Sequence, residues 1–365
     1  MKKVIYYNST LLKGGTDKYM VELIKSVDKS KFSFDVIIKD GDEVDEFMLN
    51  ELTELGTNVY CAKGRFKDKI LYLKNFFKNH KNEYDIAHIN STGQATGLIS
   101  FLAKIYGKIK KVIFHSHMGG MDRKKSLIDK FGAFLMFKYS DVLASCSTEA
   151  SKFMFGENFK NKHEVKVLNN SVDINKFTFN ETTRKRVRDE LKIKSDSFVI
   201  IHVGRFIRLK NQKFLIEVFN EIKKKKSNTM LLFIGDGELL NDCKKQVEEL
   251  NLTSSVQFLG LKNNVYDYMQ AADCFVMPSF YEGLPIVAVE AQASGLPCVL
   301  SDNISKETKI ADKVDFMSLD ASPKEWANAI LNYINLERKS GQRFMEQHKF
   351  DHKSATLEIE KLYEA

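Results

Sequence analysis

The residues best suited to do chemistry in this sequence lie between positions 277 and 302. Glu282 and Glu290 have seven residues between them, and after Glu282 comes Gly-Leu-Pro, in which the proline suits the first turn of a helix. Backbone N–H groups at a helix start can bind an anion, while carboxylates accept hydrogen bonds from hydroxyl groups. This stretch therefore has the chemical features of a site for a sugar nucleotide.

A second polar segment precedes this stretch in the sequence. Residues 204–211 read GRFIRLKN, so that Gly204, Arg205 and Lys210 stand just before a helical stretch. A guanidinium and an ammonium group beside exposed helix N–H groups suit a diphosphate better than a single carboxylate. Solvated loop cations are the alternative, which is weakened because Glu282 follows a strand of the same expected sheet.

The N-terminal half contributes a glycine pair and a histidine pair. Gly14 and Gly15 precede a helical stretch, where paired glycines let backbone N–H groups approach a phosphate, although an ordinary turn is the alternative. His115 and His117 end a strand, and a histidine there can hydrogen-bond a substrate hydroxyl or exchange protons. Both would share one face of the strand, but with no acidic or cysteine ligand nearby a structural role is favoured over a metal site.

The elements that position these residues alternate along the chain. Short apolar runs separated by amphipathic stretches predict an α/β protein with parallel sheets covered on both faces. The expected strands are residues 3–8, 34–39, 84–90, 111–117, 141–145, 165–169, 198–203, 230–234, 256–259, 274–278 and 297–300. We expect two doubly wound domains, residues 1–175 and 176–345, with a polar linker at 171–196. Residues 323–365 are expected to be helical, with the part from about 346 to 365 packing back onto the first domain.

Composition limits the classes of protein to consider. At 365 residues the chain exceeds the usual size of a single core. It has no apolar run long enough to span a membrane and no signal peptide, so we expect a cytoplasmic protein. Its five cysteines form no CxxC pair, which favours buried apolar roles over a disulfide framework or a zinc site. GxGxxG and GxxxxGK are both absent, so NAD binding and P-loop chemistry lose their usual support.

Positive charge is concentrated in the N-terminal half. Residues 1–175 contain 28 Lys and Arg against 21 Asp and Glu. No nucleic-acid motif accompanies this charge, so we expect attraction to an anionic membrane surface rather than to nucleic acid. Residues 67–80 form an amphipathic basic stretch that could dock there, and a core-facing helix with a solvated basic side is the alternative.

Several motifs together carry a family resemblance. They are Gly14-Gly15, NNSVDINKF at 169–177, GRFIRLKNQ at 204–212, GDGEL at 235–239 and SFYEGLPIVAVEAQASGLP at 279–297. In this combination the chain resembles the family 4, or group 1, glycosyltransferases along essentially its whole length. The spacing of the two glutamates between EGLP and ASGLP is the most specific of these features. The relatives that this pattern suggests act in bacterial capsule and exopolysaccharide biosynthesis.

The resemblance implies a GT-B fold, two Rossmann-like domains that face each other across a cleft. It implies that Arg205 and Lys210 bind the diphosphate, that Glu290 binds the ribose and that Glu282 binds the transferred sugar. Further contacts are implied for Gly204, for the amides of Gly283 and Leu284, for Gly14 and Gly15 on the diphosphate, and for His117 beside the sugar. Such enzymes retain anomeric configuration and need neither a cofactor nor a divalent metal.

A hexosyl transfer from a nucleotide sugar, preferably a UDP-sugar, to a saccharide acceptor linked to a polyprenyl diphosphate is the reaction expected from this resemblance. The enzyme would work in the cytoplasm, peripherally at the inner face of the membrane. Two rivals remain open: a sugar-nucleotide isomerase or epimerase on the same fold, and a non-catalytic nucleic-acid-binding protein suggested only by the net charge of +8. Neither rival explains the spacing of Glu282 and Glu290.

Overall fold

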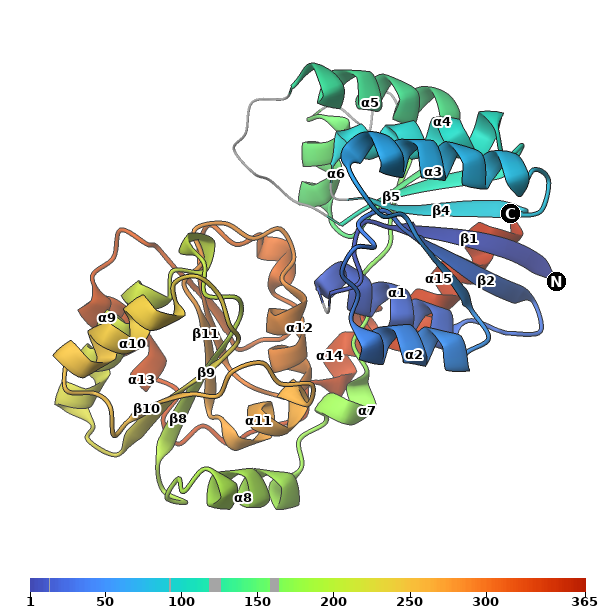
Figure 1. Ribbon diagram of the computed structural model, residues 1–365. Coiled ribbons are helices and arrows are strands. Elements are labelled where there is room, and N and C mark those ends of the chain that lie inside the picture. Colours follow the sequence, from blue (N-terminus) through green and yellow to red (C-terminus); the bar gives the residue numbers. More distant parts are fainter. Residues whose placement is uncertain (13, 92, 118–125, 158–163) are drawn as a thin grey trace. The chain divides into compact units, whose positions relative to one another are not determined.

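Two parallel β-sheets incorporate the buried apolar runs of the sequence (Figure 1). The computed structural model describes residues 1–12, 14–91, 93–117, 126–157 and 164–365. These form an N-terminal unit, Met1–Ser171 with His352–Ala365, and a C-terminal unit, Val172–Asp351. The chain therefore begins and ends in the same unit.

The N-terminal unit is a sheet with helices on both faces. Its described strands are β1 (Lys2–Asn8), β2 (Phe32–Ile38), β3 (Asn58–Cys61), β4 (Ile86–Ser91), β5 (Lys111–Ser116), β6 (Val142–Ser145) and β7 (Val165–Val167). Its helices are α1 (Gly15–Ser26), α2 (Glu46–Glu54), α3 (Phe66–Asn79), η1 (Gln94–Thr96), α4 (Gly97–Ile105), α5 (Leu127–Tyr139), α6 (Thr148–Phe155) and α15 (His352–Glu364). Because side chains alternate along a strand, Val4 and Tyr6 pack beneath α1, α2 and α15, whereas Ile5 and Tyr7 pack beneath α3, α4 and α6.

The C-terminal unit repeats this plan. Its strands are β8 (Phe198–Val203), β9 (Thr229–Ile234), β10 (Val256–Phe258), β11 (Cys274–Met277), β12 (Cys298–Ser301) and β13 (Val314–Met317). Its helices are α7 (Ile174–Phe177), α8 (Glu181–Glu190), η3 (Arg208–Lys210), α9 (Gln212–Lys225), α10 (Leu240–Glu249), α11 (Val265–Ala271), α12 (Ile286–Ala293), η4 (Lys306–Thr308), α13 (Pro323–Leu331) and α14 (Gln342–Gln347). Val199 and Ile201 face the core that holds α7, α11, α12 and α14, while Phe198 and Ile200 face α9, α10 and α13. The predicted doubly wound α/β architecture is confirmed.

The strand order of each sheet reverses direction at one pair of neighbours. The orders are β3-β2-β1-β4-β5-β6-β7 and β10-β9-β8-β11-β12-β13. The connections after β1 and β8 therefore leave to one side, and those after β4 and β11 leave to the other. Such a switch point opens a crevice at the carboxyl ends of the strands, which is where ligands bind in open α/β sheets.

The structure differs from expectation mainly at the edges and in the last segment. Edge strands β3 and β13 were not predicted, because both are short and partly exposed and so lack a continuous apolar run. Residues 323–365 form three helices rather than one, with Asn335 and Lys349 at positive φ in the breaks. In the first break Arg338 donates hydrogen bonds to the carbonyl oxygens of Met269 and Ser294, which ties the chain to the ends of α11 and α12.

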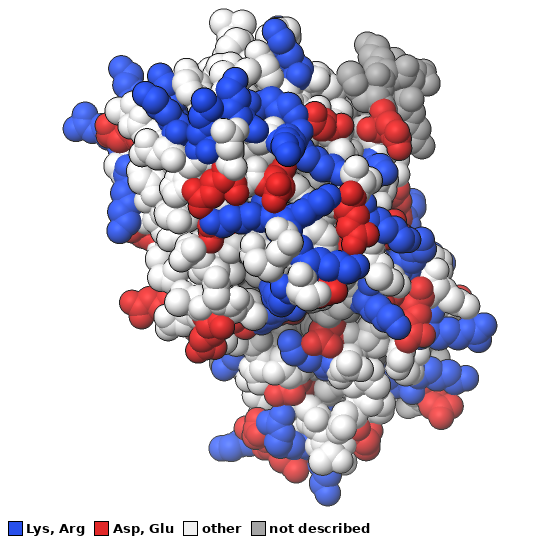
Figure 2. Space-filling view, turned by 90° about the vertical axis from the view of Figure 1, so that its right-hand side faces the viewer, with Lys and Arg blue, Asp and Glu red and all other residues white. Residues whose placement is uncertain are grey.

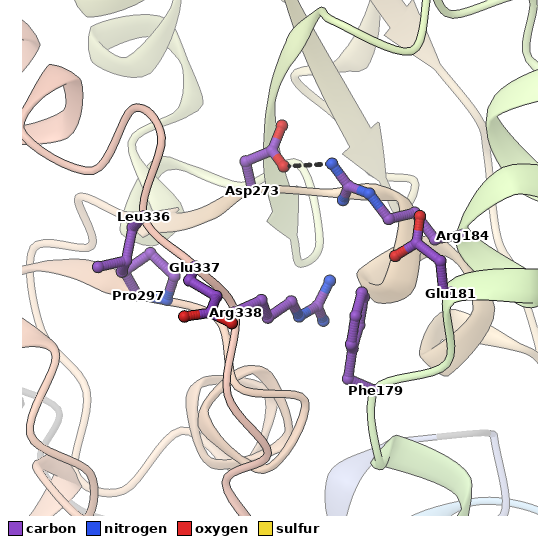
Figure 3. Close-up of a pocket in the computed structure, with 8 residues that line it drawn as sticks. All are labelled: Phe179, Glu181, Arg184, Asp273, Pro297, Leu336, Glu337 and Arg338. Carbon is purple, nitrogen blue, oxygen red and sulfur yellow. Dashed lines mark hydrogen bonds and ion pairs between the residues drawn. The ribbon is translucent and has the colours of Figure 1, made fainter.

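Of residues 171–196, expected to be a linker, all but Ser171 are instead part of the C-terminal unit. Helix α8 is fastened by Arg184 and Arg188, which pair with the two carboxylate oxygens of Asp273 at 2.6 and 2.8 Å. Figure 3 shows Arg184 and Asp273 beside Arg338 and Phe179, at a pocket of about 330 Å³. Asp273 stands just before β11, so this pocket lies at the amino ends of the strands, opposite the crevice.

Removing the carboxylate of Asp273 should destabilise the packing of α8 against the C-terminal sheet. We expect Asp273→Ala to lower the free energy of unfolding by about 3 kcal/mol, because Arg188 would keep its charge while its side chain is 4% exposed. Asp242→Ala is the matched control, since Asp242 pairs with Lys213 at 2.9 Å on the surface and should cost less than about 1 kcal/mol. Urea unfolding measures both, and equal losses would contradict this account.

Candidate active site

The loop after β8 carries the first two predicted cations. Arg205 is exposed, and Lys210 ends η3 just before α9 begins at Gln212. The amide of Phe206 donates to the carbonyl oxygen of Asp236 at 2.9 Å, so the loop after β9 stabilises the loop after β8. Gly235 has φ of 139°, and a Cβ atom there would lie 2.1 Å from the carbonyl oxygen of Gly204. The two loops can pack this closely because position 235 is glycine.

The loop after β11 brings Glu282 against Lys210. The Lys210 ammonium lies 2.5 Å from the Glu282 carboxylate, with the two side chains 16% and 17% exposed. The amide of Phe280 donates to the carbonyl oxygen of Leu209 at 2.9 Å, which joins the two loops directly. The structure thus brings together two predicted site residues, 72 positions apart in the sequence, across the switch point between β8 and β11.

Helix α12 carries the second glutamate. It begins at Ile286 with Pro285 as its N-cap, one residue later than expected, and Glu290 lies just over one turn inside. Gly283 is buried and Leu284 is partly buried in the turn that leads into this helix. Glu282 and Glu290 therefore occupy different settings, one in a loop paired with a cation and the other on a helix.

His202 belongs to this site although it was not predicted from the sequence. It is buried in β8, and its Nδ1 donates to the carbonyl oxygen of Val276 at 2.9 Å. A Cβ atom on Gly204 would lie 3.5 Å from its Nε2 and 3.4 Å from Cδ of Lys210, so the three residues are neighbours. Burial, opposed by the bond to Val276, lowers the pKa of His202 to about 4. One polar residue in the apolar run FVIIHV was the available signal.

Gly14 and Gly15 lie at the start of α1, as expected. Asp17 is fully buried in the first turn and accepts hydrogen bonds from the amides of Leu12 and Gly14, at 2.8 and 3.0 Å. It also accepts a 2.7 Å bond from Asn8 at the end of β1. The Gly14 amide is therefore engaged within the loop, and contact between this glycine pair and a diphosphate stays a prediction.

His117 is half-buried at the end of a row of histidines on one face of the N-terminal sheet, in which His88 and His115 are fully buried. The ring centroids of His115 and His117 are 4.1 Å apart, so the predicted shared face is confirmed. His115 Nδ1 is 3.2 Å from Nε2 of His88, whose Nδ1 is 2.7 Å from the hydroxyl of Tyr363 on α15. Burial lowers the pKa of His88 and of His117 to about 3 and holds that of His115 well below its usual range. All three rings are therefore neutral near pH 7.

Known proteins share both the sequence and the architecture described above. Residues 183–349 match the family model described as glycosyl transferases group 1. The chain is 30% identical over 342 residues to the putative glycosyltransferase EpsF of Bacillus subtilis (strain 168), covering 90% of this chain and 87% of that one. The chain belongs to the group 1 glycosyltransferases.

Two further comparisons bear on this glycosyltransferase. It is 25% identical over 312 residues to the UDP-Gal:alpha-D-GlcNAc-diphosphoundecaprenol alpha-1,3-galactosyltransferase of Escherichia coli, which covers 82% of this chain and 79% of that one. Its fold matches Anabaena Alr3699/HepE, solved in complex with UDP and glucose, with a TM-score of 0.82 and 17% identity over 100% of both chains. The expected GT-B fold of the glycosyltransferase is thereby confirmed.

Two further findings apply to the residues that the structure describes. In these residues, no three His, Cys, Asp or Glu side chains of the glycosyltransferase are placed to hold a metal ion together. Across the same part of the chain, no helix combines the length and apolar character that crossing a bilayer requires.

The close packing at Gly235 gives a test of the cation loop. Gly235→Ala should push the Gly204 carbonyl away and displace Arg205, and we expect donor binding by the glycosyltransferase to weaken at least about tenfold. Gly260→Ala is the matched control, because Gly260 also has positive φ (69°) but no heavy atom would lie within 4 Å of the new Cβ. Calorimetric titration with donor compares them, and equal weakening in both variants would contradict this role.

The neutral histidines should make stability depend on pH. Since unfolded histidines titrate near 6.5 while His88 and His117 hold a pKa of about 3, the unfolded state binds extra protons as pH falls. We expect each such histidine to lower the free energy of unfolding by up to about 1.4 kcal/mol per pH unit below about pH 6.5. Urea unfolding between pH 7 and about pH 5 measures the slope. His115→Gln should flatten it and the exposed control His348→Gln should not, so equal slopes in all three proteins would refute the prediction.

Proposed function

We propose that this glycosyltransferase moves a sugar from a UDP-sugar to a hydroxyl group of a lipid-linked saccharide, with retention of anomeric configuration, during synthesis of a bacterial surface polysaccharide. The observation that carries the proposal is the meeting of Lys210 and Glu282 at the switch point of the C-terminal sheet. A cation for the diphosphate and a carboxylate for sugar hydroxyls stand there side by side. That is the pairing of groups that a nucleotide sugar needs.

The charges of this loop indicate how the reaction would be helped. Breaking the bond between the sugar C1 and the phosphate oxygen leaves the bonding electrons on the phosphate and creates an oxocarbenium-like sugar. Arg205 and Lys210 would stabilise the departing diphosphate, which is the group whose charge grows most. These two cations could carry that charge without a metal ion, and the enzyme is proposed to work without one. Glu282 would hold the sugar hydroxyls, and Glu290 the ribose.

His117 is proposed to contact the transferred sugar from the N-terminal unit. Its Nε2 is buried, and the ring is neutral because the effect of burial on its pKa outweighs that of a hydrogen bond with Asn170. A neutral imidazole nitrogen can accept a hydrogen bond from a sugar hydroxyl or donate one, depending on its tautomer. The neighbouring rings of His88 and His115 are neutral and so bring no charge to this contact.

The nature of donor and acceptor is supported by a relative. The Escherichia coli protein compared above is named for transfer from UDP-Gal to an acceptor on diphosphoundecaprenol. We infer the same classes here, a UDP-sugar and a polyprenyl-diphosphate-linked saccharide. An enzyme with such an acceptor would work at the cytoplasmic face of the membrane that holds it.

Loss of the lysine should remove transfer without unfolding the protein. Lys210→Ala should lower turnover by about one to two orders of magnitude, since a hydrogen bond to a charged group is worth about 1.5–3 kcal/mol. Lys213→Ala, which removes an exposed lysine of α9, is the control and should keep wild-type turnover. Glu282→Ala should lower turnover less in the Lys210→Ala variant than in the wild-type enzyme, because the two side chains form one ion pair. Wild-type turnover in Lys210→Ala would contradict the proposed role of Lys210 in sugar transfer.

A donor screen tests the reaction itself. UDP-, GDP- and ADP-sugars should be compared by thermal stabilisation and then by release of nucleoside diphosphate with and without a polyprenyl-diphosphate-linked saccharide. The expected result is a release of nucleoside diphosphate that depends on the acceptor. NMR of the product should show a new glycosidic bond with the same axial or equatorial orientation as in the donor. Conversion of the donor without acceptor and without release would instead identify an isomerase.

A further inference from the structure

Helix α5 of the N-terminal unit presents an uncovered apolar stripe to solvent. Leu127 is 81% exposed, Ile128 64%, Phe131 60% and Phe134 56%. Leu127, Phe131 and Phe134 follow the three- and four-residue spacing of one helical face. The other exposed residues of α5 are Lys130 and Lys138. A stripe of large apolar side chains bordered by lysines is therefore all that this face of the helix offers.

The opposite face of α5 fixes this orientation. It packs against α4 and η1 through Gly132, Leu135 and Met136, and Figure 1 shows α5 on the outer side of α4. A Cβ atom on Gly97 would lie 2.0 Å from the carbonyl oxygen of Gly132, so the two helices touch backbone to backbone. Rotating α5 to bury the stripe would break this close packing. The exposure of the stripe is therefore built into the fold.

The exposed charged residues of α5 itself are of one sign, Lys130 and Lys138. Asp129, the one carboxylate between Leu127 and Tyr139, is 4% exposed and accepts hydrogen bonds from Ser126 in the capping box of α5. The Lys138 ammonium lies 5.6 Å from the ring centroid of Phe134, so its stem follows the stripe while its charge stays outside. Figure 2 shows Lys and Arg side chains gathered over the upper part of the visible face, with acidic side chains among them.

Helix α3, expected as the membrane-docking candidate, is less suited. Its main apolar residues, Leu73, Phe76 and Phe77, are buried against the sheet, which is the core-facing alternative considered above. Lys69 is engaged by Asp40 and Asp42 at 3.1 and 2.6 Å. The apolar residues of α3 that pack on the sheet therefore stabilise the fold, and its exposed Phe66 and Leu71 do not follow the three- and four-residue spacing of one helical face.

We propose that α5 lies in the interfacial layer of an anionic lipid bilayer, with Leu127, Phe131 and Phe134 among the acyl chains. Large apolar side chains flanked by lysines, without an exposed carboxylate, are what such an interface binds. A protein partner or a second copy would match this surface only if it brought acidic groups around its own apolar patch. The bilayer supplies both anionic headgroups and apolar depth in one surface.

The position of α5 gives this contact a use. Gly132 lies against η1, the segment after the carboxyl end of β4, so the first turn of α5 extends beyond that edge of the sheet. His117 follows β5 at the same edge. Resting on the function proposed above, insertion of this turn would bring the acceptor side of the N-terminal unit to the membrane that holds a lipid-linked saccharide.

Tryptophan fluorescence can test the insertion directly. The natural Trp326 is fully buried, so an added exposed tryptophan reports on its own surroundings. Phe131→Trp should shift to shorter wavelength on vesicles of phosphatidylglycerol and phosphatidylcholine and be quenched by brominated lipid. Phe66→Trp is the matched control on α3, where Phe66 is 65% exposed, and it should not respond. Leu127→Ser with Phe131→Ser should weaken vesicle partition at least about tenfold.

The outcomes separate this inference from the proposed function. A response at position 66 but not at 131, or vesicle binding that the serine variant leaves unchanged, would overturn the role of α5. So would a wild-type dimer that the serine variant converts to monomer in sedimentation without any change in vesicle binding. Donor turnover needs no vesicles, so a protein that turns over donor but ignores vesicles loses only the docking surface. One that inserts α5 but turns over no donor keeps the surface and loses the proposed reaction.

Discussion

Parallel strands with helical crossovers impose the constraint on which both halves of this protein depend. Each sheet adds strands in one direction and then returns to its starting strand to add the rest on the other side. The crossover helices leave a crevice where the two directions diverge, at β1 beside β4 and at β8 beside β11. The loops at these two places can therefore carry binding and catalytic residues. Lys210 and Glu282 come from the two sides of one such place. In the other, Asn90 donates to Asn8, and Asn8 donates to Asp17.

Buried charge is handled differently at the two edges of the C-terminal sheet. At the amino ends, Arg184, Arg188 and Arg338 donate to several backbone carbonyls and to Asp273, and this network fixes α8 and the segment before α14. At the carboxyl ends, the ion pair of Lys210 is with Glu282, the one carboxylate that the described part of the chain places against its charge. A cation with many partners is structural because moving it breaks them all. A cation with one carboxylate partner can exchange that partner for a phosphate.

The sequence was most informative where burial or close approach left one choice. Interior strands such as β8 were predicted to the residue, since a strand covered on both faces must be apolar throughout. Edge strands β3 and β13 were missed because solvent permits polar residues there. That Lys210 and Glu282 belong to loops of the same sheet was predicted from the strand pattern, but the place of His202 was not, since only the structure shows which side of β8 meets Gly204. The exposure of the apolar stripe of α5 could not be predicted either, because the sequence does not show whether a sheet covers such a stripe.

The row of histidines links the last helix of the chain to the N-terminal site. A neutral imidazole has one donor and one acceptor, so the contacts from Tyr363 to His88 and from His88 to His115 must run in a single direction. If the Tyr363 hydroxyl donates to Nδ1 of His88, then Nε2 of His88 donates to Nδ1 of His115, and His115 carries its own proton on Nε2. The tautomer beside His117 is then set by α15, which the chain makes only after the whole C-terminal unit. The N-terminal unit therefore lacks the contact of Tyr363 with His88 until α15 has packed against it.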